Sequence, residues 1–192
     1  ILRLAEAKTF LEVGSFCGAS MAHALSVPSL RRAVSVDMEI RGFRGTGQVF
    51  RQNMEKYKKV FNSEAEVIQV SGNSRDHTVK QQVFHQFPNA SVDVYFIDGD
   101  HFDPLPDYYI YKHLVRPGGF IVWDDFKNHR VVGPSLKRLA LDEEHLKCYH
   151  NIGSIKNFAR AANLVKVGET AFGLPYSHSN EFIMQKKCDC KE

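Results

Sequence analysis

Carboxylates stand directly after two apolar stretches of the chain. The run YFIDGDH, Tyr95–His101, leaves Asp98 at the end of one stretch. The run VWDD leaves Asp124 and Asp125 at the end of another. Unpaired negative charge beside buried apolar residues is costly, and Mg²⁺ and Ca²⁺ bind oxygen ligands and offset such repulsion. If the two runs meet in one crevice, they favour a hard divalent cation.

Other roles for these residues stay open. Successive strand residues point to opposite faces, so Asp124 and Asp125 can both bind a metal only where the chain turns out of the strand. Asp100 could cap a helix instead, and Asp125 could face solvent. His101 could take up a proton at neutral pH, although a lone loop histidine is more often inert.

A glycine-containing loop follows the apolar run at the start of FLEVGSFCGAS, residues 10–20. A dinucleotide-binding loop has the pattern Gly-x-Gly-x-x-Gly, and here Phe16 and Ala19 replace the second and third glycines. A diphosphate ligand is therefore disfavoured. A tight turn at Gly14, a small residue at Gly18 and a helix start with Ser20 suit a carboxylate or amino-acid group.

Two further strand ends carry polar residues. Asp37 follows the glycine loop by roughly 20 residues, where an acidic side chain can accept the hydroxyls of a ribose; the alternative is a solvated acidic residue. The turn SGNSRD, residues 71–76, could hydrogen-bond an adenine edge, or Ser74 could simply cap the next helix.

Short apolar runs alternate with helical patterns along the chain, which predicts an α/β fold with helices on both faces of a mostly parallel sheet. In such sheets ligands bind at the carboxyl ends of the strands, where the polar residues above would gather. The expected strands are Thr9–Val13, Ala33–Val36, Ala65–Val70, Val92–Ile97, Gly119–Trp123 and Asn180–Gln185. The expected helices are Ala19–Leu25, Gln48–Phe61, Asp76–Phe87, Pro106–Val115 and Pro134–Glu144.

The rest of the chain shows no repeat or linker, so residues 1–192 are expected to form a single domain. Residues 151–179 are poorly periodic and predict an irregular segment. We expect this segment to shape a substrate pocket together with Phe102, Leu105, Tyr108 and Tyr109.

Composition disfavours some classes of function. Lys and Arg number 25 against 22 Asp and Glu, and no basic block predicts nucleic-acid binding. No apolar run is long enough to cross a membrane and no signal-peptide pattern is seen, so we expect a cytoplasmic protein. The four cysteines are too few and too irregularly placed for a disulfide framework, so reduced thiols are expected.

Together, LEVGSFCGAS, VSVD, SGNS, FIDGDH and RPGGFIVWDD resemble the motif series of class I S-adenosylmethionine-dependent methyltransferases. The series is most similar to the metal-dependent O-methyltransferases of the catechol O-methyltransferase-like group and to relatives that methylate macrolide sugars. The resemblance runs from Thr9 to about Phe126. It implies a Rossmann-like, doubly wound sheet of seven strands, in which NEFIMQ is the antiparallel last strand.

The resemblance also implies a role for each motif. S-adenosylmethionine is expected to bind at Gly14, Ser15, Gly18, Ser20, Asp37, Asn73, Ser74 and Asp98. A divalent metal such as Mg²⁺ is expected at Asp98, Asp124 and Asp125. His101 corresponds to the base of the macrolide-sugar enzymes, and the lysine found there in catechol-type members is missing, which disfavours a catechol.

The expected reaction is methyl transfer to a hydroxyl oxygen of a small molecule or sugar, by a chain that could form a homo-oligomer. One alternative is a metal-dependent hydroxylase on the same fold, which would need His113 or His129 beside His101. Another is a non-catalytic cofactor-binding module. A NAD-dependent dehydrogenase is less favoured because of Phe16.

Overall fold

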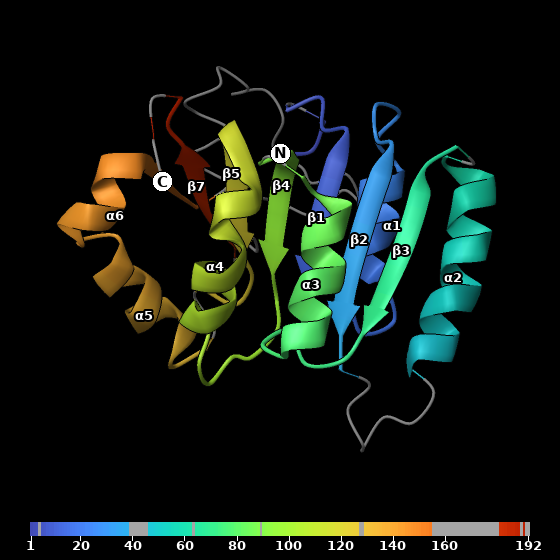
Figure 1. The fold of residues 1–192 in the computed structure, drawn as a ribbon, viewed down its shortest axis with the longest axis horizontal. Coiled ribbons are helices and arrows are strands. Elements are labelled where there is room, and N and C mark those ends of the chain that lie inside the picture. The colour runs from blue at the N-terminus through green and yellow to red at the C-terminus, as the bar shows by residue number, and fades with distance from the viewer. Residues whose placement is uncertain are drawn as a thin grey trace.

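A seven-stranded sheet forms the centre of the molecule, with strand order β3-β2-β1-β4-β5-β7-β6 (Figure 1). The computed structural model describes residues 1–3, 5–38, 46–62, 64–88, 90–126, 129–154, 181–188 and 190. The strands are β1 Thr9–Val13, β2 Arg32–Asp37, β3 Glu66–Ser71, β4 Val92–Ile97, β5 Val115–Trp123, β6 Tyr149–Ser154 and β7 Phe182–Lys186. The predicted mostly parallel sheet with an antiparallel last strand is confirmed.

The order of the strands creates a switch point beside β1. β1 pairs in parallel with both β2 and β4, so the chain runs outward in one direction through β2 and β3 and in the other through β4 and β5. β7 pairs antiparallel with β5 and β6. The carboxyl ends of the parallel strands lie at the lower edge of Figure 1, where ligands bind in sheets of this kind.

Helices cover both faces of the sheet, because successive strand residues point to opposite sides. Helices α1 and α2 pack on one face, with the strand residues Phe10, Ala33 and Val94. Helices α3, α4 and α5 pack on the other, with Leu11, Val34 and Tyr95. The helices are α1 Ala19–Leu25, α2 Thr46–Val60, α3 His77–Gln86, α4 Leu105–Tyr111, η1 Lys112–Leu114 (a short 3₁₀ helix), α5 Val132–Leu139 and α6 Glu143–Cys148.

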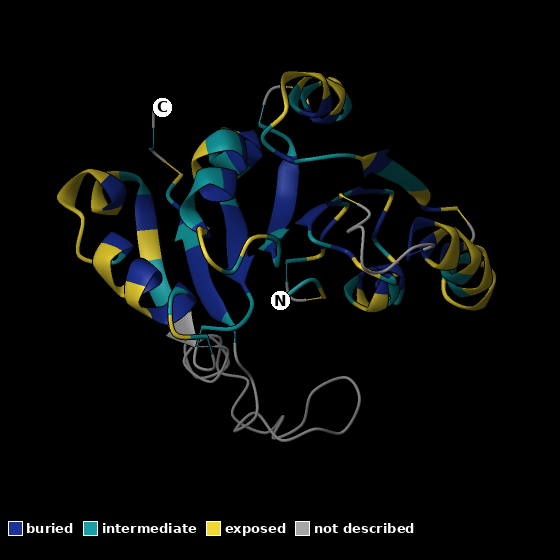
Figure 2. Cartoon of the chain, turned by 90° about the horizontal axis from the view of Figure 1, so that it is seen from below, coloured by how far each residue is buried: buried dark blue, intermediate teal, exposed yellow. Residues whose placement is uncertain are grey.

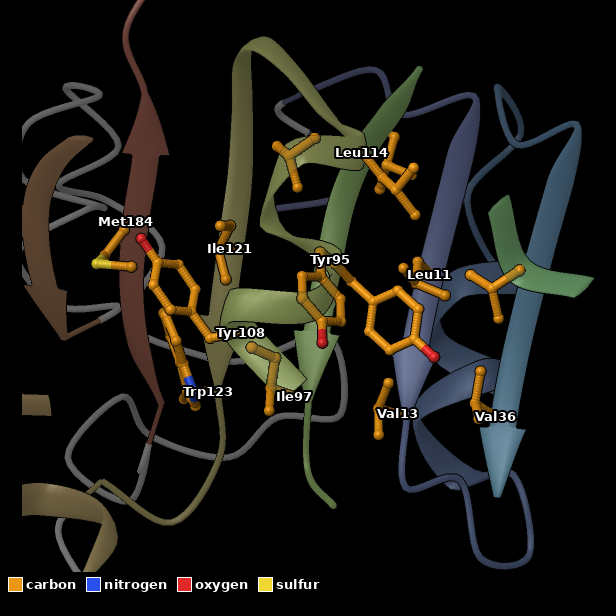
Figure 3. Packing of buried hydrophobic residues seen from close by; sticks show 14 of the residues in the cluster. Leu11, Val13, Val36, Tyr95, Ile97, Tyr108, Leu114, Ile121, Trp123 and Met184 are labelled. Carbon is orange, nitrogen blue, oxygen red and sulfur yellow. The ribbon is translucent and has the colours of Figure 1, made fainter. Parts of the chain in front are cut away.

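Burial follows this layering. Viewed toward the carboxyl ends of the strands, the central strands are buried and the outer faces of the helices are exposed (Figure 2). On the α4 side, large aromatic residues fill the space between helix and sheet, among them Tyr95, Tyr108 and Trp123 (Figure 3). These side chains form a closely packed layer next to the carboxyl ends of β4 and β5.

Some predicted elements differ from the structure. Strand β5 begins at Val115 and not at the expected Gly119, so the helix expected to reach Val115 ends before it. Residues 151–154, expected to begin an irregular segment, belong to edge strand β6, and the rest of that segment lies outside the described residues. The helix expected over Pro134–Glu144 is two helices, because Asp142 accepts hydrogen bonds from the backbone N–H of Glu144 and His145 and so starts α6.

The cysteine prediction is wrong for one pair. Cys148 and Cys190 form a disulfide that ties the end of α6 to the chain after β7. Cys17 and Cys188 are free thiols. Within the described part of the chain, no helix is both long and apolar enough to span a membrane.

Candidate active site

Gly14 lets the loop after β1 lie directly on the end of β4. Its φ is 88°, and its N–H donates to the carbonyl of Val36 at 2.8 Å. A Cβ atom at this position would lie 2.1 Å from the carbonyl oxygen of Asp98 and would clash with it, so the position requires glycine. The predicted cofactor loop and the predicted metal ligand Asp98 are therefore brought into contact through the backbone.

Asp37 fixes this loop from the side of β2. Its Oδ2 accepts hydrogen bonds from the backbone N–H of Ser15 at 2.9 Å and of Phe16 at 2.7 Å. Phe16 has a φ of 46° and is 54% exposed, so its ring stands away from the core. Oδ1 of Asp37 makes no hydrogen bond within the described residues, and the expected contact with a ribose stays a prediction.

Glu12 is a site residue that the sequence interpretation missed. It is fully buried in β1, and its Oε1 accepts a hydrogen bond from the hydroxyl of Ser20. Burial, more than the charges of Asp98 and Asp37, raises the pKa of Glu12 to about 8. The signal was present, because Glu12 is the one charged residue in the apolar strand TFLEV.

Two polar atoms under the loop lack a partner. Oε2 of Glu12 and Oγ of Ser15 are buried and make no hydrogen bond within the described residues. Buried polar groups are nearly always paired, so these two atoms need a partner that the described residues do not supply. The hydroxyl of Ser20 donates to Glu12, and the expected contact of Ser20 with the cofactor stays a prediction.

Gly18 has a packing role in the structure. It precedes α1 with a φ of 86°, and a Cβ there would lie 2.5 Å from Cε of Met54 and 2.9 Å from the ring of Phe50, both on α2. The missing side chain therefore allows α2 to approach the loop. A direct contact of Gly18 with the cofactor stays a prediction.

The predicted adenine-side turn is held by local bonds. Oγ of Ser74 donates to Oδ1 of the buried Asp107 at 2.5 Å, and Oδ1 of Asn73 accepts from the N–H of Arg75 at 2.9 Å. Burial raises the pKa of Asp107, while the Ser74 hydroxyl opposes that change. The hydroxyl of Ser74 is thus already used to join the β3 loop to α4, and its expected role at an adenine stays a prediction.

Arg75 joins the same turn to the loop after β4. Its guanidinium contacts the carboxylates of Asp100 at 3.1 Å and Asp103 at 3.2 Å, and it donates to the carbonyl of Asp103 at 2.8 Å. Asp100 also accepts from the N–H of Phe102 at 3.0 Å and so closes a turn; it does not cap a helix, because the N-cap of α4 is Pro104. These contacts hold the short loop that carries His101.

His101 lies between two of the predicted metal ligands. Its Nε2 is 3.2 Å from Oδ1 of Asp98 and 3.1 Å from Oδ2 of Asp125. The chain leaves the strand after Trp123, as the φ of 54° at Asp125 shows, so consecutive carboxylates are no longer forced to opposite faces. The structure therefore brings Asp98, His101, Asp124 and Asp125 together at the carboxyl edge.

Burial and mutual repulsion both make negative charge costly within this group. Burial, followed by the charge of Asp124, raises the pKa of Asp98 to about 7, against the opposing effect of His101. Burial also raises the pKa of Asp124. The chemistry of these oxygens fits a hard cation that would offset the repulsion. No set of three His, Cys, Asp or Glu side chains in the described part has the geometry of a formed metal site.

A small cavity opens beside this group. Its lining includes Asp98, His101, Pro104, Trp123 and Asp124. Of the aromatic residues expected to shape a substrate pocket, Tyr108 is buried in the core. Phe102 is 71% exposed and directly follows His101 in the chain.

Of the two histidines considered as partners of His101, only His129 lies near it. The ring centroids of His101 and His129 are 5.4 Å apart. His113 packs against Phe84 of α3, with ring centroids 5.1 Å apart.

Residues 11–126 match a protein family described as "Methyltransferase domain". The matched segment spans more than half of the chain and contains both the glycine loop and the carboxylate group. The chain belongs to this methyltransferase family. The chain is also 26% identical over 190 residues to an uncharacterized protein of Acanthamoeba polyphaga mimivirus. That alignment covers 92% of this chain and 78% of the viral protein.

Solved methyltransferases share its fold. An O-methyltransferase from Bacillus cereus in complex with SAH is 19% identical, with a TM-score of 0.57 over 97% of this chain and 76% of that one. The O-methyltransferase TomG from Streptomyces achromogenes, solved with SAM, is 16% identical, with a TM-score of 0.53 over 97% of this chain and 75% of TomG. TomG is involved in tomaymycin synthesis. The predicted class I methyltransferase fold is confirmed.

The buried Glu12 predicts a pH-dependent stability of this methyltransferase domain. With a pKa of about 8 in the folded chain and an ordinary value of 4.5, Glu12 holds a proton between these pH values only when folded. The free energy of unfolding therefore falls as pH rises through this window, by up to about 5 kcal/mol, and levels off above it. Glu12→Gln should flatten that fall, as measured by urea unfolding at pH 5 and pH 8 without cofactor.

Glu55→Gln, on the exposed face of α2, is the control and should keep the wild-type pH dependence. Parallel pH profiles for wild type and Glu12→Gln would show that Glu12 ionises normally in the folded chain.

Proposed function

We propose that this methyltransferase transfers a methyl group from S-adenosylmethionine to a hydroxyl oxygen of a small molecule or sugar, with His101 as the base. The observation that carries the proposal is the position of His101, whose Nε2 lies between the carboxylates of Asp98 and Asp125 at the end of β4. The glycine loop that would hold the cofactor lies on that same strand end. Base and methyl donor would therefore face one space.

The residues under the glycine loop suit the amino-acid end of S-adenosylmethionine. Its ammonium group could pair with Oε2 of Glu12, which would lose its proton when this positive charge binds, and its carboxylate could accept from the unpaired hydroxyl of Ser15. Oδ1 of Asp37 is available to a ribose hydroxyl. The two solved neighbours with SAH and SAM support this cofactor, since they share the fold.

Methyl transfer is an in-line displacement, in which a bond forms from the acceptor oxygen to the methyl carbon as the bond from carbon to sulfur breaks. A hydroxyl is a poor nucleophile until its proton is removed. His101 would take that proton on Nδ1, because Nε2 needs its own hydrogen to donate to Asp98 and Asp125. Asp98 and Asp125 hold the imidazole in position and stabilise the positive charge that it gains.

Asp98, Asp124 and Asp125 are the residues that would hold a divalent cation such as Mg²⁺. When bound, such a cation lowers the pKa of an acceptor hydroxyl and fixes its orientation. The raised pKa values of Asp98 and Asp124 support this assignment, because burial, and after it the neighbouring carboxylates, make the charged forms costly without a cation.

A metal-dependent hydroxylase is the second candidate, and the nearness of His129 to His101 is the observation that favours it. Two histidines and one carboxylate are the ligands of many non-haem iron enzymes. The family match to a methyltransferase domain weighs against it.

The first test is methyl transfer itself. The protein should bind SAH in calorimetry, and incubation with methyl-labelled S-adenosylmethionine and a metabolite extract should give labelled products by mass spectrometry. We expect the label on oxygen. Binding of NAD without binding of SAH would contradict the proposal, and hydroxylated products that depend on iron would favour the second candidate.

The variant His101→Gln tests the base. Loss of a positioned general base typically lowers turnover by about 10²- to 10⁴-fold. We expect a fall of this size with unchanged affinity for SAH, because His101 lies outside the glycine loop. His85→Gln, an exposed residue in the last turn of α3, is the control. Turnover that survives in His101→Gln would place the base elsewhere.

The metal assignment is tested by titrating the protein with Mg²⁺ in calorimetry. Wild type should bind the ion, and Asp124→Asn should bind it at least about 10-fold more weakly, since one charged oxygen ligand is lost. Glu143→Gln, an exposed residue of α6, is the control. Equal binding by wild type and Asp124→Asn would exclude Asp124 as a ligand and leave the role of His101 standing.

A further inference from the structure

We propose that the indole N–H of Trp123 binds an uncharged oxygen of the methyl acceptor, next to the hydroxyl that is methylated. The proposal rests on the proposed methyl transfer and deepens it, because it assigns a residue that selects the substrate. It starts from a buried hydrogen-bond donor that has no partner within the described part of the chain.

Trp123 is almost fully buried, with 1% of its surface exposed, and its Nε1 makes no hydrogen bond to the described residues. A buried tryptophan N–H usually finds a partner, because an unpaired buried donor is unfavourable. Trp123 ends β5 and lines the cavity with Asp98, His101 and Asp124. Its indole nitrogen lies at the end of the ring nearest the carboxyl edge of the sheet (Figure 3).

Packing holds the ring in this orientation. The ring centroid of Tyr108 lies 5.3 Å from that of Trp123, and that of Phe182 lies 6.3 Å away. These neighbours belong to α4 and β7, so the indole is held between the sheet and a helix. A donor fixed in this way needs little reorganisation when it binds a ligand.

The position of β5 assigns this donor to the acceptor and not to the cofactor. The expected cofactor residues other than Asp98 follow β1, β2 and β3, whereas β5 lies on the far side of β4 from β1. His101 and Asp98 lie between the two regions, at the end of β4. An oxygen bound by Trp123 would therefore belong to the molecule whose hydroxyl faces His101.

The chemistry of the cavity narrows the choice of oxygen. An indole N–H is a donor only, so its partner must offer a lone pair. The neighbouring carboxylates of Asp98 and Asp124 disfavour another negative charge. A hydroxyl, ether or carbonyl oxygen satisfies both conditions, which favours a neutral acceptor that carries more than one oxygen.

Trp123 is the only tryptophan of the chain, so its indole N–H gives a single resonance in a ¹⁵N–¹H NMR spectrum. The protein saturated with SAH is titrated with methyl α-D-glucopyranoside, with catechol and, as a control without oxygen, with toluene. We expect at least one oxygenated probe to shift the indole proton downfield in a saturable manner, and toluene not to do so.

An indole resonance that neither oxygenated probe moves, or that toluene moves equally, would overturn the proposal. A spectrum in which SAH itself moves no resonance would contradict the proposed function instead.

A second experiment removes the donor and keeps the ring. Growth on β-(3-benzothienyl)alanine replaces the N–H of this single tryptophan with sulfur, with little change in shape. The affinity for the oxygenated probe should fall by about 2- to 10-fold, the effect of one neutral hydrogen bond, while the affinity for SAH stays constant. Unchanged affinity for the probe in a protein with wild-type thermal stability would overturn the assignment of Trp123.

Discussion

The site depends on one close contact between two backbone segments, Gly14 on the carbonyl of Asp98. The loop after β1 can reach the end of β4 only because Gly14 has no side chain and takes a positive φ. The contact lies at the switch point of the sheet, where β1 separates the two directions in which the chain proceeds. It joins the side that would hold the cofactor to the side that would hold the acceptor.

Most of the central sheet could be predicted because its strands are buried on both faces. Such strands are continuous apolar runs, and the ends of β1 and β4 agree with the sequence prediction to the residue. Edge strand β6, YHNIGS, lacks that pattern because polar residues and a glycine interrupt it, whereas the other edge strand, β3, is more apolar and was predicted. The Cys148–Cys190 disulfide was missed for a related reason, because it joins residues 42 positions apart and local sequence carries no sign of it.

Residue types predicted where the site lies better than they predicted what each side chain does. The structure gathers Asp98, His101, Asp124 and Asp125 as expected, because strand ends converge at one edge. Glycine, however, permits both the approach of a ligand and the approach of a helix, and Gly18 shows the second. Serine likewise binds either a ligand or a neighbouring carboxylate, and Ser20 and Ser74 each donate to a carboxylate. Only the three-dimensional partners decide between these roles.

The proposed base and the proposed metal site share their carboxylates, and this sharing couples them. Oδ1 of Asp98 and Oδ2 of Asp125 both face Nε2 of His101, so neither oxygen can serve the imidazole and a cation in the same way at once. Each carboxylate has a second oxygen, and Asp124 contacts the backbone N–H of Asp125 through its Oδ1 alone. A cation held by the remaining oxygens would leave the imidazole oriented, whereas one held by the oxygens that face Nε2 would release it. The orientation of His101 would therefore depend on which carboxylate oxygens bound a cation.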